Sequence, residues 1–572
     1  MAAAVRRGAP SEGPTFADRM HACLAARVRP ATGFVSQPEP RSIGRVARGR
    51  QLLIGNFLFA GHLIRAPDAL PWDLKAPSAD WTAEMQGFEW LDDLVAVGTV
   101  EARDLAQRWT FAWVDRFGRG RGAGWQPAIT GRRLVRWVHH ATLLLTGTDA
   151  DRQRGFYAAL ASQAVFLSRR RRATPPGLPR FEALTGLVHA GLSLTGMEGR
   201  VGTAPAALAR LCDREIDAEG GIATRSPEEL SEILTLLTWS SEALEVAGHG
   251  TPAGISQAMR RIAPTLRALR HSDGSLPRFH GGGRGIEGRI DAALAAVPTT
   301  LGARDGSVMG FRRLAAGRTV LIADAAAPPT DDDGAEAHAS TGAIEISSGR
   351  RQLIVSCGPG RGFGPSWRRA GRATASHSTM MIEGQSSTRL GPLENGAERL
   401  EPGPRQVRAE IKEDGGASVL EVSHDGWRES HGLTHARQIR MGPEGRRIDG
   451  IDSLLPLDDG DRQRLAAAVD ATGLQGVPWA LRFHLHPDTD VAVDLGGTAA
   501  SLALPSGEIW VLRHDRAGGV VVEPSVFLEN GRLKPRACRQ MILRGTLLER
   551  GVRVRWSLEK AQDQPDFLRD VR

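Results

Sequence analysis

The hydrophobic pattern of the chain changes its period near residue 300, and this change constrains the fold more than any other feature. Between about residues 100 and 270, apolar residues recur at helical spacing in segments separated by Gly, Pro, Asp or Thr. Beyond about residue 300, short β-branched runs alternate with turns that contain Gly, Asp and Pro. The sequence therefore predicts an all-helical region followed by an all-β region.

The helical region is expected to close into a ring of helical hairpins. Short links between consecutive helices make them antiparallel neighbours, which favours an α/α toroid, with a compact multi-helix bundle as the alternative. This region is also rich in tryptophan, which at helical spacing indicates a core more often than a sugar-stacking platform. The tryptophans in question are Trp72, Trp81, Trp90, Trp109, Trp113, Trp125 and Trp137.

The region beyond residue 300 contains many short strands with no helical pattern between them. Runs such as 319–324, 352–355 and 508–512 indicate an antiparallel β-sandwich. The predicted organisation is an N-terminal extension over residues 1–50, an α/α toroid over 51–290 and a β-sandwich over 305–572.

The chain is basic, with 73 Lys and Arg residues against 65 Asp and Glu residues, and almost all of the positive charge is arginine. A biased genome composition is the plainer explanation. A cleft built for anions is the alternative, because guanidinium groups hold carboxylates and sulfates through paired hydrogen bonds. Basic residues are dispersed without a zinc-finger, RRM or homeodomain pattern, which argues against a nucleic-acid partner. No apolar run approaches the ~20 residues of a transmembrane helix.

Other sequence features disfavour several further classes of protein. The four cysteines lie far apart, which implies neither a disulfide scaffold nor a thiolate zinc site. The glycine-rich run 358–364 lacks the strand-to-helix setting of a phosphate loop, so no nucleotide cofactor is expected. Residues 1–33 lack the apolar core of a secretory signal, which predicts a cytoplasmic protein unless the true start lies elsewhere.

Two histidine pairs could be taken for metal sites. His139 and His140 are adjacent and do not share a face, so a surface position at a helix end is expected. His484 and His486 lie two apart on a predicted strand and project to one side, but no third ligand is apparent. A structural role is therefore favoured for both pairs.

The most specific motif is the segment 375–384, Ala-Ser-His-Ser-Thr-Met-Met-Ile-Glu-Gly. Together with the segments 336–346 and 353–358, it resembles the start of the β domain of the heparinase II/III-like polysaccharide lyases. That family shows a His-x-His-x-Asp segment, a strand, an Asp-x-Gly turn and a His-Asn-Thr or His-Ser-Thr segment. In the helical half, the segments 87–91 and 131–137 look like segments of bacterial members.

The resemblance implies β-elimination of an acidic, uronate-containing polysaccharide at the interface between toroid and sandwich. In this reaction the substrate carboxylate is neutralised, a base removes the adjacent C5 proton, and an acid protonates the leaving oxygen. Family members use an Asn or His as the neutraliser, a Tyr and a His as base and acid, and a metal held by two His and one Asp. The resemblance also implies a place in the cell envelope, in the periplasm.

Several family positions are replaced in this sequence. The segment 225–229, Arg-Ser-Pro-Glu-Glu, resembles the family's Arg-Ser-Pro-x-Tyr, so Glu229 stands where the tyrosine would. Glu336 occupies the position of the first histidine of His-x-His, and the neutralising Asn has no clear counterpart near residues 184–189. Tyr157, the only tyrosine, lies on a predicted helix and is expected in the core.

The metal set implied by the resemblance is incomplete. His338 and His377 match the two histidine ligands, whereas Ser356 falls at the usual aspartate. Imidazole suits zinc, but a third protein ligand is needed, and Glu336 or Glu345 could supply it. A site without metal, in which both histidines bond to buried loops, is equally open.

The resulting hypothesis is a lyase in which Arg225 holds the substrate carboxylate and Glu229 or Glu336 acts as the base after burial raises its pKa. Arg278 and His280 lie in the segment 270–283. Substrate contact by these two residues is one interpretation of this segment, and a solvated linker is the favoured one. A second hypothesis is a degraded family member that binds an envelope glycan without cleaving it. A third is hydrolysis by the Glu229 and Glu336 carboxylates.

Overall fold

The chain forms two compact units, which we call the helical unit and the β unit. The helical unit comprises residues 1–220, 229–263 and 285–301, and the β unit comprises 221–228, 264–284 and 302–572. The segments 221–228 and 264–284, predicted within the helical region, thus belong to the β unit. The computed structural model describes residues 13–197, 199, 202–283, 285–297, 306–382, 384–394, 397–401, 403–516 and 518–562.

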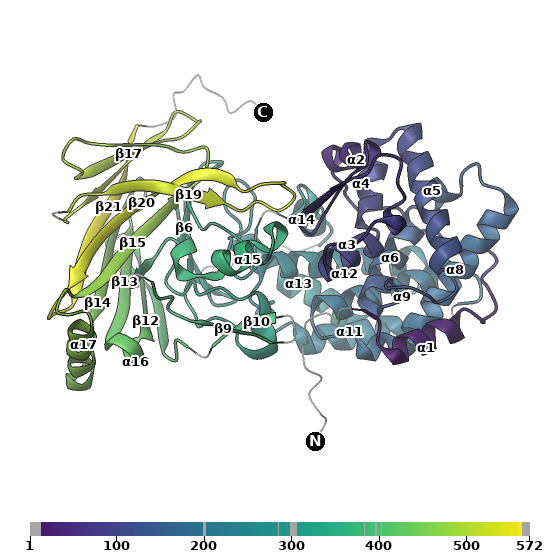
Figure 1. Cartoon of the computed structure of the whole chain (residues 1–572), viewed down its shortest axis with the longest axis horizontal. Coiled ribbons are helices and arrows are strands. Elements are labelled where there is room, and N and C mark those ends of the chain that lie inside the picture. The colour runs from purple at the N-terminus through teal and green to yellow at the C-terminus, as the bar shows by residue number, and fades with distance from the viewer. Residues whose placement is uncertain are drawn as a thin grey trace. The chain divides into compact units, whose positions relative to one another are not determined.

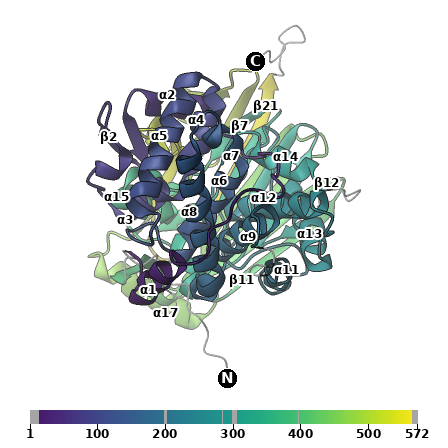
Figure 2. The same ribbon diagram turned by 90° about the vertical axis from the view of Figure 1, so that its right-hand side faces the viewer.

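The helical unit is built from antiparallel helices joined by short links (Figures 1 and 2). Helices α6, α8 and α9 pack against one another. Thr99 and Asp149 cap the N-termini of α5 and α8 through their side-chain oxygens. None of the described helices is long and apolar enough to cross a membrane. The helices are α1 (Phe16–Ala25), α2 (Val46–Leu53), α3 (Ala79–Gly87), α4 (Glu89–Val97), α5 (Val100–Phe117), α6 (Pro127–His139), α7 (Ala141–Leu145), α8 (Ala150–Arg170), α9 (Leu178–Ser193), α11 (Ala204–Glu215), α12 (Pro227–Val246), α13 (Ala253–Ala268) and α14 (Arg289–Ala295).

Tryptophan side chains form the core of the helical unit. All seven tryptophans named above are buried, which confirms the core prediction over the sugar-stacking alternative. The guanidinium of Arg133 is buried with them and lies 4.1 Å from the ring centroid of Trp113. Tyr157 is only partly buried and packs edge-on against Phe34.

Helices α6 and α9 approach each other backbone to backbone. A Cβ atom on Gly131 would lie 2.6 Å from the Cα of Ala183, and one on Gly186 would lie 2.7 Å from the carbonyl oxygen of Gly131. Only glycine fits at these two positions. This close contact brings the side chains that flank it, Arg132 and Glu182, within hydrogen-bonding distance.

The β unit contains two large antiparallel sheets. One sheet has the strand order β11-β12-β13-β14-β21-β18-β17-β16, and the other has β19-β20-β15-β7-β6-β5-β4-β3, with β8 also pairing with β15. The two sheets enclose one hydrophobic core, as the sandwich prediction requires. The strands are β3 (Gly306–Val308), β4 (Phe311–Ala316), β5 (Thr319–Asp324), β6 (Ile344–Ser348), β7 (Arg351–Val355), β8 (Met380–Ile382), β11 (Val407–Asp414), β12 (Ala417–Trp427), β13 (Leu433–Met441), β14 (Arg447–Leu455), β15 (Val477–Leu485), β16 (Asp490–Val493), β17 (Ala499–Ala503), β18 (Ile509–His514), β19 (Val521–Phe527), β20 (Arg536–Leu547) and β21 (Val552–Gln562).

A buried polar chain crosses four neighbouring strands of the first sheet. The N–H of Gly426 donates to Nδ1 of His424, so the proton of His424 lies on Nε2, which is 3.2 Å from Nδ1 of His435. His435 then donates through Nε2 to Asp452, at 2.9 Å. Asp452 also accepts from Trp556, at 2.8 Å. Every donor and acceptor in this row of hydrogen bonds has a partner only while both imidazoles are neutral.

Burial lowers the pKa of His424 and of His435 below the ordinary histidine value, and we expect this to make stability pH-dependent. The unfolded chain takes up protons on these groups below about pH 6.5, whereas the folded chain does not. The free energy of unfolding should therefore fall between pH 7.5 and 5.5, by up to about 1.4 kcal/mol per pH unit for each histidine. Urea unfolding at a series of pH values measures this.

The matched variants are His424→Gln, which should flatten the pH dependence, and His249→Gln, which alters an exposed histidine and should leave it unchanged. A free energy of unfolding that stays constant over this pH range would contradict the assignment of neutral imidazoles.

Candidate functional site

The carboxylate of Asp324 is the centre of a buried polar site in the β unit. It ends β5, is fully buried, and accepts hydrogen bonds from Arg225 and from the Ser340 hydroxyl at 2.6 Å. His280 Nε2 lies 3.1 Å from its second oxygen. Burial by itself would raise the pKa of Asp324, but Arg225 and His280 outweigh burial and hold it well below its usual range. Asp324 is therefore a permanent anion inside the unit.

Every N–H group of Arg225 donates to an acceptor of the protein. Its Nε donates to the carbonyl oxygen of Met309 at 3.0 Å, and its terminal nitrogens donate to the carbonyls of Gly310, Ala326 and Ala327 and to Asp324. A guanidinium has five N–H donors, and all five are thus used. The predicted contact between Arg225 and a substrate carboxylate would require one of these bonds to break.

Backbone strain accompanies this arrangement. Arg225 and His280 have φ angles of 52° and 47°, in the left-handed region that non-glycine residues rarely adopt. Arg225 donates to Asp324 and His280 lies 3.1 Å from it, and such conformations persist only where the surrounding contacts determine them. A Cβ on Gly310 would lie 2.6 Å from Nε of Arg225, so this position needs glycine.

Three histidines follow Asp324 in a defined order. The N–H of His338 donates to Nδ1 of His280 at 3.0 Å, which leaves the proton of His280 on Nε2, facing Asp324. Nε2 of His338 accepts from the N–H of Gly281 at 3.2 Å, so its proton lies on Nδ1. The rings of His338 and His377 are 5.1 Å apart. Among the described residues, neither Nδ1 of His338 nor either nitrogen of His377 has a hydrogen-bond partner of good geometry.

Burial first, and the neighbouring histidines second, lower the pKa of His338 well below its ordinary value and that of His377 to about 3. Both rings are therefore neutral at pH 7, as a metal ligand must be. The described residues nevertheless contain no group of three or more His, Cys, Asp or Glu arranged to hold a metal ion. Two imidazoles alone do not fit a zinc site, so zinc stays a prediction that lacks its third ligand.

The two glutamates considered as that third ligand are engaged elsewhere. Glu345 is buried and accepts from the backbone N–H groups of Arg278 and Ser356, at 3.1 and 3.2 Å. Glu336 is half-buried and pairs with Arg368 at 2.7 Å. As a candidate base, Glu336 is thus already engaged by a guanidinium of the protein.

The remaining predicted residues also make protein contacts. Glu229 lies in the helical unit, where it accepts from the N–H of Leu178 at 3.2 Å. Arg278 is buried, donates to the carbonyl oxygens of Cys357 and Leu528, and lies 3.9 Å from the ring centroid of Phe527. The interpretation of the segment 270–283 as a solvated linker is wrong, because most of its side chains are packed inside the β unit.

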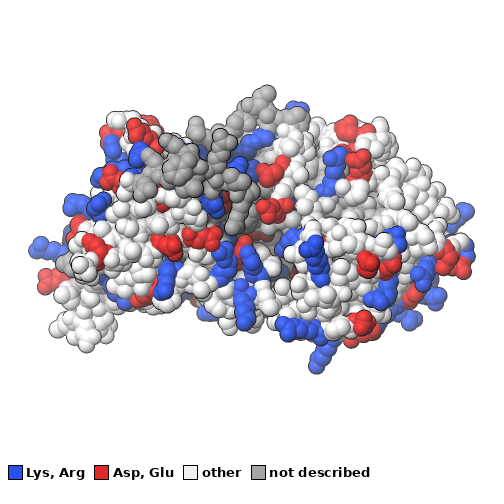
Figure 3. All heavy atoms as spheres, turned by 90° about the horizontal axis from the view of Figure 1, so that it is seen from above, with Lys and Arg blue, Asp and Glu red and all other residues white. Residues whose placement is uncertain are grey.

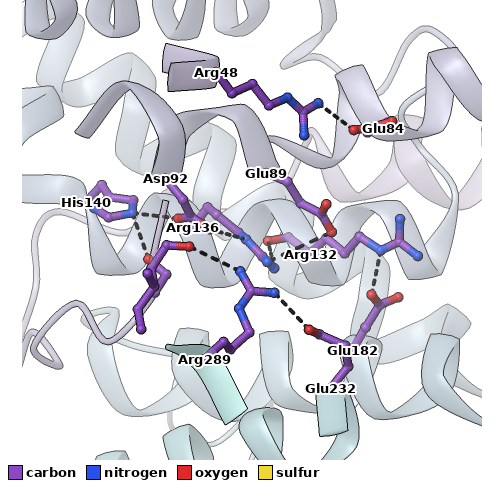
Figure 4. Close-up of polar contacts among 12 residues, drawn as sticks. Arg48, Glu84, Glu89, Asp92, Arg132, Arg136, His140, Glu182, Glu232 and Arg289 are labelled. Atoms are coloured by element: carbon purple, nitrogen blue, oxygen red, sulfur yellow. Dashed lines mark hydrogen bonds and ion pairs between the residues drawn. The ribbon is translucent and has the colours of Figure 1, made fainter. Parts of the chain in front are cut away.

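A second polar site lies in the helical unit, and we call it the ion cluster (Figure 4). Arg132 pairs with Glu182 at 2.6 Å, and Arg289 pairs with Glu232 at 2.9 Å. Arg136 pairs with Asp92 at 3.4 Å. The ion cluster consists of Arg48, Glu84, Glu89, Asp92, Arg132, Arg136, His140, Glu182, Glu232 and Arg289.

The ion cluster has a buried base and a partly exposed rim. The side chains of Arg132, Glu232 and Glu89 are 25%, 27% and 35% exposed. Beneath them, Arg136 and Asp92 are almost completely buried. Burial opposes charge on Glu89, but the surrounding guanidiniums, Arg136 first, lower its pKa below the ordinary value. The rim therefore presents fixed charges of both signs.

The prediction of a surface position for His139 and His140 is wrong. Both are buried, because α6 ends inside the helical unit. His140 Nε2 is 2.8 Å from Asp92, and the His139 ring lies 4.9 Å from the ring of His189. Burial lowers the pKa of His139 well below its ordinary value.

Sequence reasoning missed both Asp324 and the ion cluster. Asp324 had one available signal, since it is a lone carboxylate at the end of a run of four apolar residues. For the ion cluster, the sequence offered no signal except the family resemblance of the segments 87–91 and 131–137. Its ion pairs join different helices, so no local pattern contains them. On the face shown in Figure 3, basic and acidic side chains are interspersed, so surface charge does not single out a site.

Three comparisons relate this chain to known proteins. Residues 298–557 match the family described as heparinase II/III-like, C-terminal. The chain is 33% identical to FtsZ-localized protein C of Caulobacter vibrioides (strain NA1000 / CB15N), over 96% of this chain and 93% of that protein.

Solved structures of the same fold include heparinase III, with a TM-score of 0.67 at 12% identity, covering 94% of this chain and 88% of that one. A mutant of the heparan sulfate lyase HepC from Pedobacter heparinus gives a TM-score of 0.58 at 12% identity, covering 96% and 88%. At this identity the likeness concerns the fold alone, and it agrees with the predicted helical region followed by antiparallel sheets. The chain belongs to the heparinase II/III-like family.

Proposed function

We propose that this chain binds an acidic, uronate-containing glycan without cleaving it, and that the ion cluster of the helical unit holds the glycan's carboxylate or sulfate. One observation carries the proposal. Nε of Arg132 donates to Glu182, while none of the described residues accepts a hydrogen bond from the two terminal nitrogens of Arg132. A partly exposed guanidinium is thus held in place with one edge open for an anion.

The surrounding charges make Arg132 a suitable contact. Glu182, Glu89 and Glu84 raise its pKa above the ordinary value in spite of burial, so it keeps its charge at any relevant pH. Glu182 is 8% exposed, so its bond to Arg132 is buried and fixes the orientation of the Arg132 side chain. Little side-chain entropy of Arg132 would then be lost when a ligand binds. Glu89, on the same rim, would repel an anionic ligand.

The groups predicted for catalysis favour binding over cleavage. β-Elimination needs a group that neutralises the substrate carboxylate and a base that reaches the C5 proton. All five donors of Arg225 bond to protein, Glu336 is paired with Arg368, and the rings of His338 and His377 are fully buried. A periplasmic location, which the family resemblance implies, belongs to the same proposal.

We expect Arg132→Lys to weaken binding of heparan sulfate or chondroitin sulfate oligosaccharides by about tenfold, because lysine keeps the charge but loses the paired N–H geometry. Glu89→Gln should strengthen binding several-fold by removing the repulsion. Isothermal titration calorimetry at low salt measures both. Arg103→Lys, on the surface of α5, is the control and should not change the affinity. Equal affinities for all four proteins would contradict the assignment of the ion cluster.

We expect no cleavage of uronate polysaccharides by the purified chain, between pH 5 and 9, with or without added zinc. The unsaturated product of β-elimination absorbs in the ultraviolet, which makes the assay direct. A rise in absorbance that is lost in Glu229→Ala or His377→Ala, while Arg103→Lys remains active, would establish the lyase hypothesis in place of this proposal.

A second candidate function rests on the full-length relative. That protein is named for its localisation with FtsZ, and the 33% identity extends over nearly the whole of both chains. As an alternative to a periplasmic glycan-binding protein, we therefore propose that this chain associates with FtsZ. The purified chain should co-sediment with polymers of FtsZ from the same organism and stay in the supernatant without them. Its absence from the pellet at micromolar concentrations would reject this candidate.

A further inference from the structure

Two of the four cysteines lie near one another in the β unit, beside the segment 375–378 that contains His377. Cys357 lies two residues beyond the end of β7, and Cys538 lies on β20. Ser525 on β19 is the direct cross-strand partner of Cys538, so the two side chains lie on the same face of the sheet. The Ser525 hydroxyl is also 3.8 Å from the Cys357 sulfur. One serine therefore lies beside both thiols.

A histidine base completes this group, and its protonation state follows from its partners. Nε2 of His484 lies 2.9 Å from the carbonyl oxygen of Ala375, which can only accept, so Nε2 carries the proton. Nδ1 is consequently an acceptor, 3.6 Å from the Cys357 sulfur and 2.8 Å from the Ser525 hydroxyl. A nucleophile, a base and a group that orients the base are thus present together.

The backbone holds Cys357 against this base. Its N–H donates to the carbonyl of Ser376 at 2.9 Å, and its carbonyl accepts from the N–H of Leu528 at 2.7 Å. Burial alone would raise the pKa of Cys357, but His484 and its other hydrogen-bond partners lower it below the ordinary cysteine value. Cys212 is also buried, and burial raises its pKa to about 12. The two buried thiols thus differ in the presence of a base.

We propose that Cys357 is an oxidation site for small hydroperoxides and that Cys538 resolves the oxidised form as a disulfide. The Cys357 sulfur attacks one peroxide oxygen and the O–O bond breaks. Cys357 becomes a sulfenic acid, and its thiol proton passes through Nδ1 of His484 to the leaving oxygen, which departs as water or an alcohol. The Cys538 sulfur then attacks the sulfenic sulfur, and water leaves with the sulfenic oxygen and the Cys538 proton. In sum, two thiols and one hydroperoxide give one disulfide, one water or alcohol and one further water.

The surroundings of Cys538 suit the second step. Cys538 is only partly buried, whereas Cys357 is buried. Burial raises the pKa of Cys538 to about 12, so Cys538 is the weaker nucleophile at pH 7, and oxidation begins at Cys357.

The test uses the reduced full-length chain, hydrogen peroxide and the sulfenic acid reagent dimedone, with peptide mapping by mass spectrometry. In Cys538→Ser, dimedone should accumulate on Cys357 at least about tenfold faster than on Cys212, the buried thiol without a histidine base. In the unaltered chain, a non-reducing digest should contain the peptide that joins Cys357 to Cys538. Faster or equal labelling of Cys212 overturns the proposal.

The role of the base is tested by His484→Asn, which should slow labelling of Cys357 about tenfold. The matched control is His486→Asn, directly after the end of β15. Equal rates in the two variants overturn the role of His484. If His484→Asn does not fold, the comparison of Cys357 with Cys212 in Cys538→Ser still decides. A dimedone adduct on Cys357 in the unaltered chain, without the joined peptide, overturns the role of Cys538.

Discussion

The buried carboxylate of Asp324 is the interaction on which the candidate site of the β unit depends. A charge without solvent is stable only when several donors face it, and Arg225, His280 and Ser340 supply them. These donors come from three separate segments of the chain, so the anion ties the segments together. Two of the donors adopt left-handed backbone conformations, which shows how strongly the contacts determine the local structure.

This arrangement explains why the residues that resemble the lyase motif do not form an open catalytic site within the β unit. Arg225 neutralises Asp324 and has no donor left, and His280 and His338 are linked through the backbone of His338. The same physics acts on the ion cluster of the helical unit, but with a different result. There the buried carboxylate of Glu182 uses one edge of Arg132 and leaves the other edge open. The chain thus keeps the family's fold, while the proposed anion contact is Arg132 of the helical unit and not Arg225 of the β unit.

The two sites and the cysteine pair are all built from buried groups whose charge or protonation state is set by neighbours. Histidines that are neutral because they are buried recur in both units, at His139, His338 and His424. His484 differs in that its unprotonated nitrogen lies beside a thiol as well as the Ser525 hydroxyl, which makes it the base of the proposed oxidation chemistry. Glycan binding at Arg132 and oxidation at Cys357 involve different units, so each can be altered without the other.

The sequence by itself determined the order of helical and β regions, the tryptophan core and the family, because hydrophobic period and local motifs are properties of neighbouring residues. It also brought His338 and His377 together correctly, through their motif. Only the tertiary structure decided that Arg225 donates all its N–H groups to Asp324 and to carbonyl oxygens of the protein. It also decided that His139 and His140 are buried, and that Ser525 lies beside both Cys357 and Cys538. Hydrogen-bond partners and burial depend on which distant segments meet, and no local pattern records that.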